Sequence, residues 1–371
     1  MKDSHTMKYT RLKKRMSFIA VLMAAVLLTA CGASEPSSST SVSGSGPSST
    51  STTVVDQGGH RVQLPKSVTK VAATPLPWAS VIWALDGNSN RLIAMNPGAK
   101  RIYDRSFLKN LDQNFGKINT SVINADFSVN IEQLLKLKPD VVFLWNDQDS
   151  VRKQLLEVGI TPVMLNYAKN IDSLTKDVKL VGDVLGRPKR AHEFIESLKS
   201  SEKTPASAPN ASATKTLYLR DPELKVASAG NVNTKLIADG GGVNVAAGVK
   251  GQWTAVSMEQ IIKWDPQVIY LSEFDNFTPQ DLYKNKLPGQ DWSKVSAVRN
   301  HHVYKTPVGI YTWDAPGLET GLMQQWIAEK ETLNSASSSS RDQAKGFYKT
   351  FFGKALTNAN LDQIFKQSEN K

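Results

Sequence analysis

Apolar residues recur along this chain either at helical spacing or in short continuous runs typical of strands. One segment that combines a helical pattern with a following strand pattern occurs twice. Residues 129–144 are VNIEQLLKLKPDVVFL and residues 256–271 are VSMEQIIKWDPQVIYL, with seven of the sixteen positions identical. In each copy, apolar residues at helical spacing precede Pro139 or Pro266, and a continuous β-branched run follows. This order predicts an amphipathic helix that leads into a strand covered on both faces. Two copies predict two α/β lobes, and a cleft between lobes is a common ligand site.

Polar residues mark the start of both repeated helices. Asn130 and Ser257 occupy the N-cap positions, and the Gln three residues after each cap is expected to bond back to the N–H group of the cap residue. Glu132 and Glu259 lie in the first turns, where the helix dipole favours a negative charge. Each proline then ends its helix.

The remaining apolar spacing predicts further elements of the same two kinds. Gly58 and Gly59, between alternating residues, indicate a β-hairpin turn. Strands are predicted at 70–74, 91–94, 162–165, 216–219 and 303–305, and helices at 79–85, 151–158, 172–185 and 318–330, with a last pair from 342 onward.

Pro188 opens another helix, after which residues 200–214 mark a clear break in composition. We therefore expect the fold class to be α/β, with two Rossmann-like lobes and a ligand cleft between them. The N-terminal lobe is predicted at 53–187, a single long rigid connecting helix at 188–204 and the C-terminal lobe at 205–371.

The beginning of the chain predicts export. Residues 1–15 hold six basic residues and one acid, and residues 17–30 are almost wholly apolar. This apolar run is shorter than the roughly 20 residues that span a bilayer, so it predicts a cleaved signal peptide over 1–30 and not a membrane anchor.

The sequence Leu-Thr-Ala-Cys that ends at Cys31 resembles the bacterial lipoprotein box. This resemblance implies cleavage before Cys31 and lipidation of its thiol; the alternative is a plain secretory peptide with an incidental cysteine. Cys31 is the only cysteine of the chain, so no intramolecular disulfide can form. Residues 31–52 are rich in serine and poor in apolar residues, which predicts a flexible tether.

The net charge and the motifs exclude several classes of function. The formal charge of +11 falls to +6 without the six basic residues and one acid of the leader. No basic block, zinc-finger spacing or aromatic RNA-binding motif is present, so we expect no nucleic acid partner. The globular part holds no Gly-x-Ser-x-Gly motif and no thiol. We therefore expect no catalytic residue, no resident cofactor and no protein-held metal.

The chain resembles the lipid-anchored solute-binding proteins of ABC importers for ferric siderophores, haem and vitamin B12. The similarity covers nearly all of the chain from Val54 on. It is carried, in order, by VVDQGGHRVQLPKSVTKVAA, NIEQLLKLKPDVVFLW, GGVNV, VSMEQIIKWDPQVIYL, WSKVSAVRNHHVYKTP and GFYKTFFGKALTNANLDQI. The fold that this family implies is two α/β lobes joined by one long rigid helix.

The resemblance also implies a function and partners. The protein is expected to lie outside the cytoplasmic membrane, anchored to its outer face by lipid, at the cell surface or in the periplasm. It would capture an iron chelate as a monomer and deliver it to a permease dimer with its ATPase subunits. By position, the acids that dock onto the permease correspond to Glu132 and Glu259. The alternative for each is that it only stabilises its own helix.

Ligand-binding residues are expected where strands of both lobes end at the cleft. Trp145 follows the first repeated strand and Trp253 precedes the second repeated helix; in the cobalamin-binding members of the family, aromatic residues at these places line the cleft. Flat rings bury a large area with little loss of rotamer freedom. The further candidates are Trp78, Arg101, Tyr103, Arg220, Tyr311 and Trp313. Core packing or surface stacking is the alternative for each of them.

Several ligands and one other class of protein stay open from the sequence. Cobalamin or haem could replace the iron chelate in the same role, and a tyrosine or histidine could coordinate haem iron. A bare metal ion such as zinc would need several converging His and Asp side chains, which the sequence does not indicate. An exported hydrolase would need a catalytic constellation, and none is evident.

Overall fold

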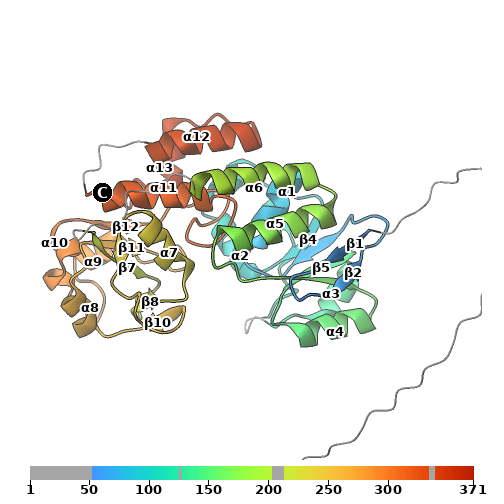
Figure 1. Cartoon of the computed structure of the whole chain (residues 1–371), viewed down its shortest axis with the longest axis horizontal. Helices are drawn as coiled ribbons and strands as arrows, with labels where there is room; N and C mark the ends of the chain where they lie inside the picture. Colours follow the sequence, from blue (N-terminus) through green and yellow to red (C-terminus); the bar gives the residue numbers. More distant parts are fainter. Residues whose placement is uncertain (1–51, 125–127, 203–212, 334–338) are drawn as a thin grey trace, which may run out of the picture. The chain divides into compact units, whose positions relative to one another are not determined.

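The computed structural model describes residues 52–124, 128–202, 213–333 and 339–371 (Figure 1). The predicted signal peptide at 1–30, the lipidation site Cys31 and all but the last residue of the predicted tether at 31–52 lie outside these residues. Among the helices of the described ranges, none combines the length and the apolar character needed to cross a membrane.

The first half of the described chain is built on a parallel sheet with the strand order β4-β3-β5-β6. Its strands are β3 (Val71–Ala73), β4 (Leu92–Met95), β5 (Val141–Trp145) and β6 (Thr161–Leu165). The predicted hairpin precedes it, as β1 (Thr53–Val55) paired antiparallel with β2 (Arg61–Gln63). Gly59 in its turn has a φ of 81°, a conformation that glycine adopts without steric cost.

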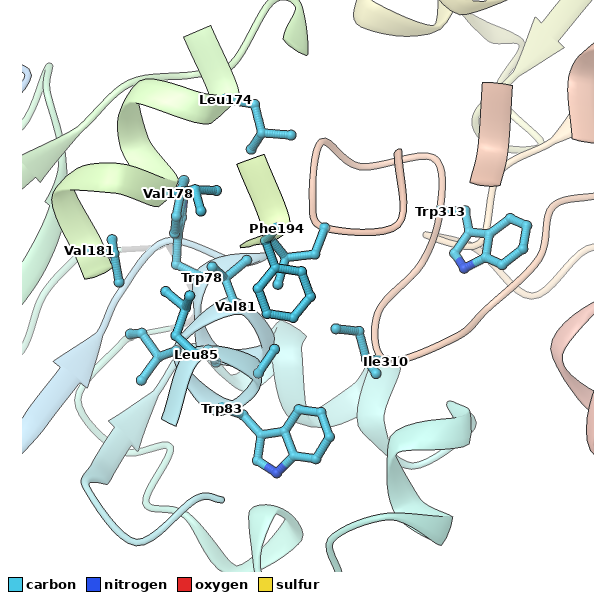
Figure 2. Close-up of a cluster of buried hydrophobic side chains, with 14 of the residues drawn as sticks. Trp78, Val81, Trp83, Leu85, Leu174, Val178, Val181, Phe194, Ile310 and Trp313 are labelled. Carbon is cyan, nitrogen blue, oxygen red and sulfur yellow. The ribbon is translucent and has the colours of Figure 1, made fainter. Parts of the chain in front are cut away.

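Helices cover both faces of this first sheet (Figure 1). Val141 and Phe143 of β5 pack into a core with α1 (Trp78–Asp86), α5 (Ile171–Leu185) and α6 (Pro188–Glu202). The alternate residues Val142 and Leu144 pack with α3 (Ile131–Leu137) and α4 (Asp149–Glu157) on the other face. Figure 2 shows the first of these cores, where side chains of α1 meet those of α5 and Phe194 of α6.

The second half is built on a mixed sheet with the order β10-β8-β7-β11-β12, and β9 pairs with β7 as well. The strands are β7 (Lys215–Leu219), β8 (Lys225–Ala227), β9 (Val243–Asn244), β10 (Trp253–Ala255), β11 (Val268–Leu271) and β12 (Val303–Lys305). β11 is parallel to β7 and β12, whereas β8 is antiparallel to β7 and β10. The short strands β8 and β10 were not predicted from the sequence.

Helices again cover both faces. Tyr218 and Tyr270 pack with α7 (Val232–Asp239) and α11 (Thr320–Glu331). Leu219 and Leu271 pack on the other face with α8 (Met258–Trp264), α9 (Pro279–Tyr283) and α10 (Ser296–Arg299). The remaining helices are α2 (Pro97–Tyr103), α12 (Ser339–Phe352), α13 (Asn358–Ile364) and short 3-10 turns at Phe107–Asn110, Phe115–Lys117 and Trp292–Lys294.

The two repeated segments form the same substructure in both halves. Asn130 Oδ1 accepts a hydrogen bond from the Gln133 N–H group at 3.1 Å, and Ser257 Oγ accepts one from the Gln260 N–H group at 3.2 Å. The predicted N-caps are therefore confirmed. The N–H group of Asn130 itself donates to the carbonyl oxygen of Val122 at 2.8 Å, so the predicted bond back from Gln133 does not form there.

The two α/β halves form two lobes within one compact unit, Ser49–Lys371. Helix α6 contacts α5 of the first lobe and α11 of the second. A second link lies near α2, where Arg105 donates to the carbonyl oxygen of Glu273 and, at 2.7 Å, to Asn276 Oδ1. Ile102 and Tyr311 form a small apolar cluster beside it. Other contacts join the lobes as well, among them the Phe107 N–H group, which donates to the carbonyl oxygen of Gly309 at 2.9 Å.

Candidate ligand-binding site

A cavity of about 300 Å³ lies where strands of both sheets end. In the first lobe, Leu76 follows β3, Trp145 ends β5 and Asn166 follows β6. In the second lobe, Arg220 follows β7 and Phe274 follows β11. Ligands of open parallel sheets bind outside the carboxyl ends of the strands, so the sheet topology itself places this site.

Aromatic rings from both lobes form the walls of the cavity. Trp145 stacks on Tyr167, with ring centroids 4.2 Å apart and planes at 19°. Trp253 comes from β10, the edge strand that pairs with β8, and its ring packs 6.0 Å from that of Tyr218. Trp145 and Trp253 are both half-buried. They give a bound molecule two partly exposed flat surfaces, which favours a large ring or a bulky chelate.

Arg220 supplies a positive charge inside this aromatic frame. Its guanidinium group lies 5.3 Å from the Trp253 ring centroid and 5.7 Å from that of Phe274. Its backbone N–H donates to the carbonyl oxygen of Lys225 at 2.8 Å, which fixes its place after β7. Within the described part of the chain, neither Arg220 nor the nearby Lys169 forms an ion pair. A guanidinium group that is stacked but not neutralised is well suited to carboxylate, catecholate or phosphate oxygens.

The acidic residue of the cavity wall is already occupied by donors from the protein. Asp314 is almost fully buried, and its carboxylate accepts hydrogen bonds from the hydroxyls of Ser272 and Thr312 and from the N–H group of Glu273. Its charge is thereby stabilised without Arg220. The positive charge of Arg220 and Lys169 consequently remains available to a ligand.

Two helices begin at the cavity, one from each lobe. Pro77 is the N-cap of α1 and has no side chain that could accept a hydrogen bond. Asn231 is the N-cap of α7, and its Oδ1 accepts from the Asn233 N–H group at 2.9 Å. Asn233 Nδ2 in turn donates to the carbonyl oxygen of Asp314 at 3.1 Å. Helix N-termini carry a partial positive charge, so both add to the preference for an anionic ligand.

The structure brings four of the predicted ligand residues to this cavity. Trp145, Trp253 and Arg220 line it with substantial exposed surface. Trp78 also lines it but is only 1% exposed. Figure 2 shows Trp78 in the core beside Val178 of α5. The Trp78 ring therefore mainly packs the first lobe and offers only an edge to the cavity.

The other four candidates lie elsewhere. Arg101 lies on the exposed side of α2 and does not line the cavity. Tyr103 is buried; its ring stacks on Phe115 at 5.3 Å and its hydroxyl donates to the carbonyl oxygen of Asp112 at 3.1 Å. Burial raises the pKa of Tyr103, so the hydroxyl remains protonated. Tyr103 packs the core of the first lobe.

Tyr311 and Trp313 belong to a buried loop between β12 and α11. Tyr311 packs against Ile102 and Val308, and burial raises its pKa. Trp313 is 1% exposed and meets the ring of Phe365 edge-on at 5.3 Å. Figure 2 shows Trp313 on this loop, beyond Ile310. Both rings bury apolar area in the protein interior, which explains why an aromatic-rich loop here does not line the cavity.

Three cavity residues that sequence analysis missed lie just after buried strands. Asn166 and Tyr167 follow β6, and Phe274 follows β11. The rule that led to Trp145 and Arg220 would also have identified these positions. Asn233 carried no such signal, because it lies in the first turn of α7 and does not follow a strand.

Glu132 and Glu259 are exposed in the first turns of α3 and α8, as the repeat predicts. Hydrogen bonds from its own backbone N–H group and from Ser257 lower the pKa of Glu259. Both side chains are therefore available as anionic contacts at equivalent positions of the two lobes.

Within the described residues, no three His, Cys, Asp or Glu side chains converge on a point where they could hold a metal ion.

Comparison with known proteins shows that this chain is similar to periplasmic binding proteins. A family model described as "Periplasmic binding protein" matches residues 105–308. A periplasmic solute binding protein from Veillonella parvula, known from a crystal structure, is 38% identical to this chain in sequence, and the two structures superpose with a TM-score of 0.80. That match covers 86% of this chain and 98% of the other.

Two curated relatives have named ligands. The molybdate-binding protein MolA of Haemophilus influenzae is 24% identical over 310 residues, which cover 74% of this chain and 83% of MolA. The vitamin B12-binding protein of Yersinia pestis is 28% identical over 183 residues, which cover 46% of this chain and 65% of that protein.

Proposed function

The chain belongs to the periplasmic binding protein family, and from this we propose that it captures an anionic metal chelate outside the cytoplasmic membrane for delivery to an ABC importer. The family and the relatives above are solute carriers, so the chain is a substrate-binding protein of such an importer and not an enzyme.

One observation carries the proposal: the Arg220 guanidinium group lies close to two aromatic rings and has no acidic partner in the described part of the chain. A cation held in this way attracts the oxygen ligands of a ferric complex, while Trp145 and Trp253 contact the organic periphery of that complex. A ferric siderophore combines these two properties. The metal would be cargo, coordinated by the chelate alone.

The size of the cavity bears on the alternatives. Its volume of about 300 Å³ lies at the lower end of the roughly 300 to 1,000 Å³ that is usual for small-molecule sites. This favours a compact chelate over cobalamin or haem, which would require the lobes to move apart. The link through Arg105 and the contacts of α6 with both lobes oppose such a movement. Molybdate, the ligand of one relative, would use Arg220 but leave the rings without a partner.

We propose that the lobes extend over 53–187 and 205–371 and that α6 is the rigid connection predicted at 188–204. In the transport cycle, Glu132 and Glu259 would contact basic pockets on the two halves of the permease. Their equivalent positions in a repeated helix support this role, because a permease dimer presents two equivalent surfaces. The protein would act as a monomer.

The sequence before the described residues supports an extracytoplasmic, membrane-anchored location. A signal peptide at 1–30 and lipidation of Cys31 would hold the protein on the outer face of the cytoplasmic membrane. The tether at 31–52 would let the lobes reach the permease.

A tryptophan-fluorescence titration tests the ligand class. The detergent-solubilised full-length chain is titrated with ferric hydroxamates, ferric catecholates, haem, cobalamin, molybdate and free metal ions. We expect saturable quenching by one type of ferric chelate. Trp145→Ala should reduce that response. Arg220→Gln should weaken binding by about tenfold or more, because hydrogen bonds to charged groups contribute about 1.5–3 kcal/mol.

Arg101→Gln is the matched control, since it removes the same charge from a residue that does not line the cavity. Equal losses in the two arginine variants would show that only the overall charge matters. A response to molybdate alone, or to free metal ions alone, would contradict the chelate proposal.

A further inference from the structure

A second chamber opens beside the main cavity. Its volume is about 330 Å³, and it lies entirely within the first lobe. It shares Leu76, Trp145 and Tyr167 with the main cavity, so the two spaces are neighbours. Its other lining residues are Thr74, Asn96, Asp147 and Gln148. The proposed function does not use this chamber.

The stacked rings of Trp145 and Tyr167 line both spaces. The Tyr167 hydroxyl donates to Asp147 Oδ2 at 3.3 Å, which ties the outer ring to the chamber wall. Burial, together with the nearby Asp147 charge, raises the pKa of Tyr167 to about 12, so its hydroxyl remains a neutral donor. Tyr167 is 44% exposed, and an arm of a ligand could therefore pass along the edge of this ring pair.

The two spaces carry opposite charge. The main cavity presents Arg220 and Lys169, neither of which forms an ion pair within the described residues. Asp147 is the charged residue of the side chamber, and no basic residue lines it. Apart from the Tyr167 hydroxyl, Asp147 has no hydrogen-bond or ion-pair partner in the part of the chain that the structure describes.

The other polar groups of the chamber are largely used within the protein. Thr74 Oγ1 donates to the carbonyl oxygen of Phe143 at 3.0 Å. Asn96 donates to the carbonyl oxygen of Thr74 at 3.0 Å and accepts from the Gly98 N–H group at 2.8 Å. Gln148 Oε1 accepts from the Trp145 N–H group at 3.0 Å. The free carboxylate oxygen of Asp147 is thus the main charged acceptor that the chamber offers.

We propose that the side chamber is a second ligand subsite, which takes a cationic arm of the same ligand whose anionic part lies at Arg220. This inference rests on the proposed function and narrows the ligand to a chelate that carries an aliphatic ammonium group. The methylene chain of such an arm would lie against the Trp145 and Tyr167 rings, where apolar contact and cation–π attraction both favour it. The ammonium group would pair with Asp147.

The test compares two ferric trihydroxamate chelates that differ only in one terminal group. One carries a free ammonium, and in the other the same nitrogen is acetylated. Affinities for the full-length chain in detergent are measured by fluorescence quenching at low salt. We expect the ammonium form to bind about threefold more tightly, as is usual for one partly exposed ion pair. Asp147→Asn should reduce this ratio to about one.

Asp149→Asn is the control. Asp149 lies two residues further along the chain, pairs with Arg152 and Lys153, and lines neither space. It should leave the ratio unchanged, which separates a direct contact from a general change of charge. Circular dichroism verifies that both variants are folded, and the wild-type comparison needs no variant at all.

Equal affinity of wild-type protein for the two chelates would overturn this inference and leave the proposed function standing. Equal loss of preference in the Asp147 and Asp149 variants would overturn it too. Binding of neither chelate would also overturn the inference, whereas the proposed function would fail only if no ferric chelate of the wider titration bound.

Discussion

A buried carboxyl group behind the cavity should make the stability of this protein depend on pH. Asp177 lies in α5, is fully buried, and accepts a hydrogen bond from the Asn166 N–H group at 3.3 Å. Its other carboxylate oxygen has no partner among the described residues. Burial raises the pKa of Asp177 from 3.8 to about 7. Since Asn166 lines the cavity, this group supports the ligand site from behind.

The direction of the effect follows from where the proton is held. Between about pH 4 and 7, the folded protein keeps a proton on Asp177 that the unfolded chain has released. The contribution of this group to the unfolding free energy is therefore complete below pH 4 and is lost as the pH rises through 7. A difference of about three pKa units corresponds to about 4 kcal/mol.

Asp177→Asn isolates this contribution because the side chains have nearly the same shape. The amide can still accept the Asn166 N–H bond, but its buried NH₂ group lacks an acceptor, which costs about 1–3 kcal/mol. At pH 4 the variant should be less stable than the wild type by about 1–3 kcal/mol, the cost of the unpaired NH₂ group. At pH 8 it should be more stable by about 1–3 kcal/mol, because the wild type must then hold a buried charge.

Denaturant unfolding followed by tryptophan fluorescence at several pH values measures both free energies. Asp172→Asn, an exposed position in the same helix, is the control and should leave the pH dependence unaltered. Parallel stability curves for wild type and Asp177→Asn between pH 4 and 8 would refute the reasoning.

Three further changes have defined outcomes. Exchanging both Glu132 and Glu259 for Gln should abolish uptake of the chelate by cells while its affinity for the purified protein stays the same; undiminished uptake would exclude the docking role. Arg105→Gln should lower the unfolding free energy by about 1–3 kcal/mol, because hydrogen bonds to the buried Glu273 and its neighbours are lost, and hydrogen exchange should quicken on both sides of this link. Hydrogen exchange that stays slow would show that the remaining contacts are sufficient to hold the lobes together. Asn130→Ala should cost about 1 kcal/mol in denaturant unfolding through loss of the N-cap bond, and an unchanged midpoint would show that the cap is redundant.

The repeated segment shows what local sequence pattern can predict. Its caps, its helix and strand order, and the burial of both strand faces depend on residues close together in the chain, and the structure has all of them. The bond expected from Gln133 to the cap residue failed for a non-local reason. Val122, which lies outside the repeat, accepts the Asn130 N–H bond instead.

The second sheet shows where the pattern is insufficient. Strands β8 and β10 contain three residues each and are stabilised by pairing with each other, although they lie far apart in the sequence. Such short segments carry too little alternation to be recognised alone. The position of Trp253 in the cavity depends on this pairing. Trp253 was identified from its place before the repeated helix, but the strand β10 that positions it was not predicted.

The candidate site could be predicted in part, for a physical reason. Trp145 and Arg220 were found because polar or aromatic residues directly after buried strands lie at the sheet edge where ligands bind. Tyr103 and Trp313 have the same residue chemistry but pack in the interior. Aromatic side chains serve cores and ligand cavities equally well, so residue type cannot separate these roles without tertiary contacts.

A crystal structure with the ferric chelate that binds most tightly would test the central claim most directly. We predict that the chelate lies between Trp145 and Trp253, with one of its anionic oxygens within hydrogen-bonding distance of the Arg220 guanidinium group. A chelate bound outside this cavity, or inside it with Arg220 directed away, would contradict the account.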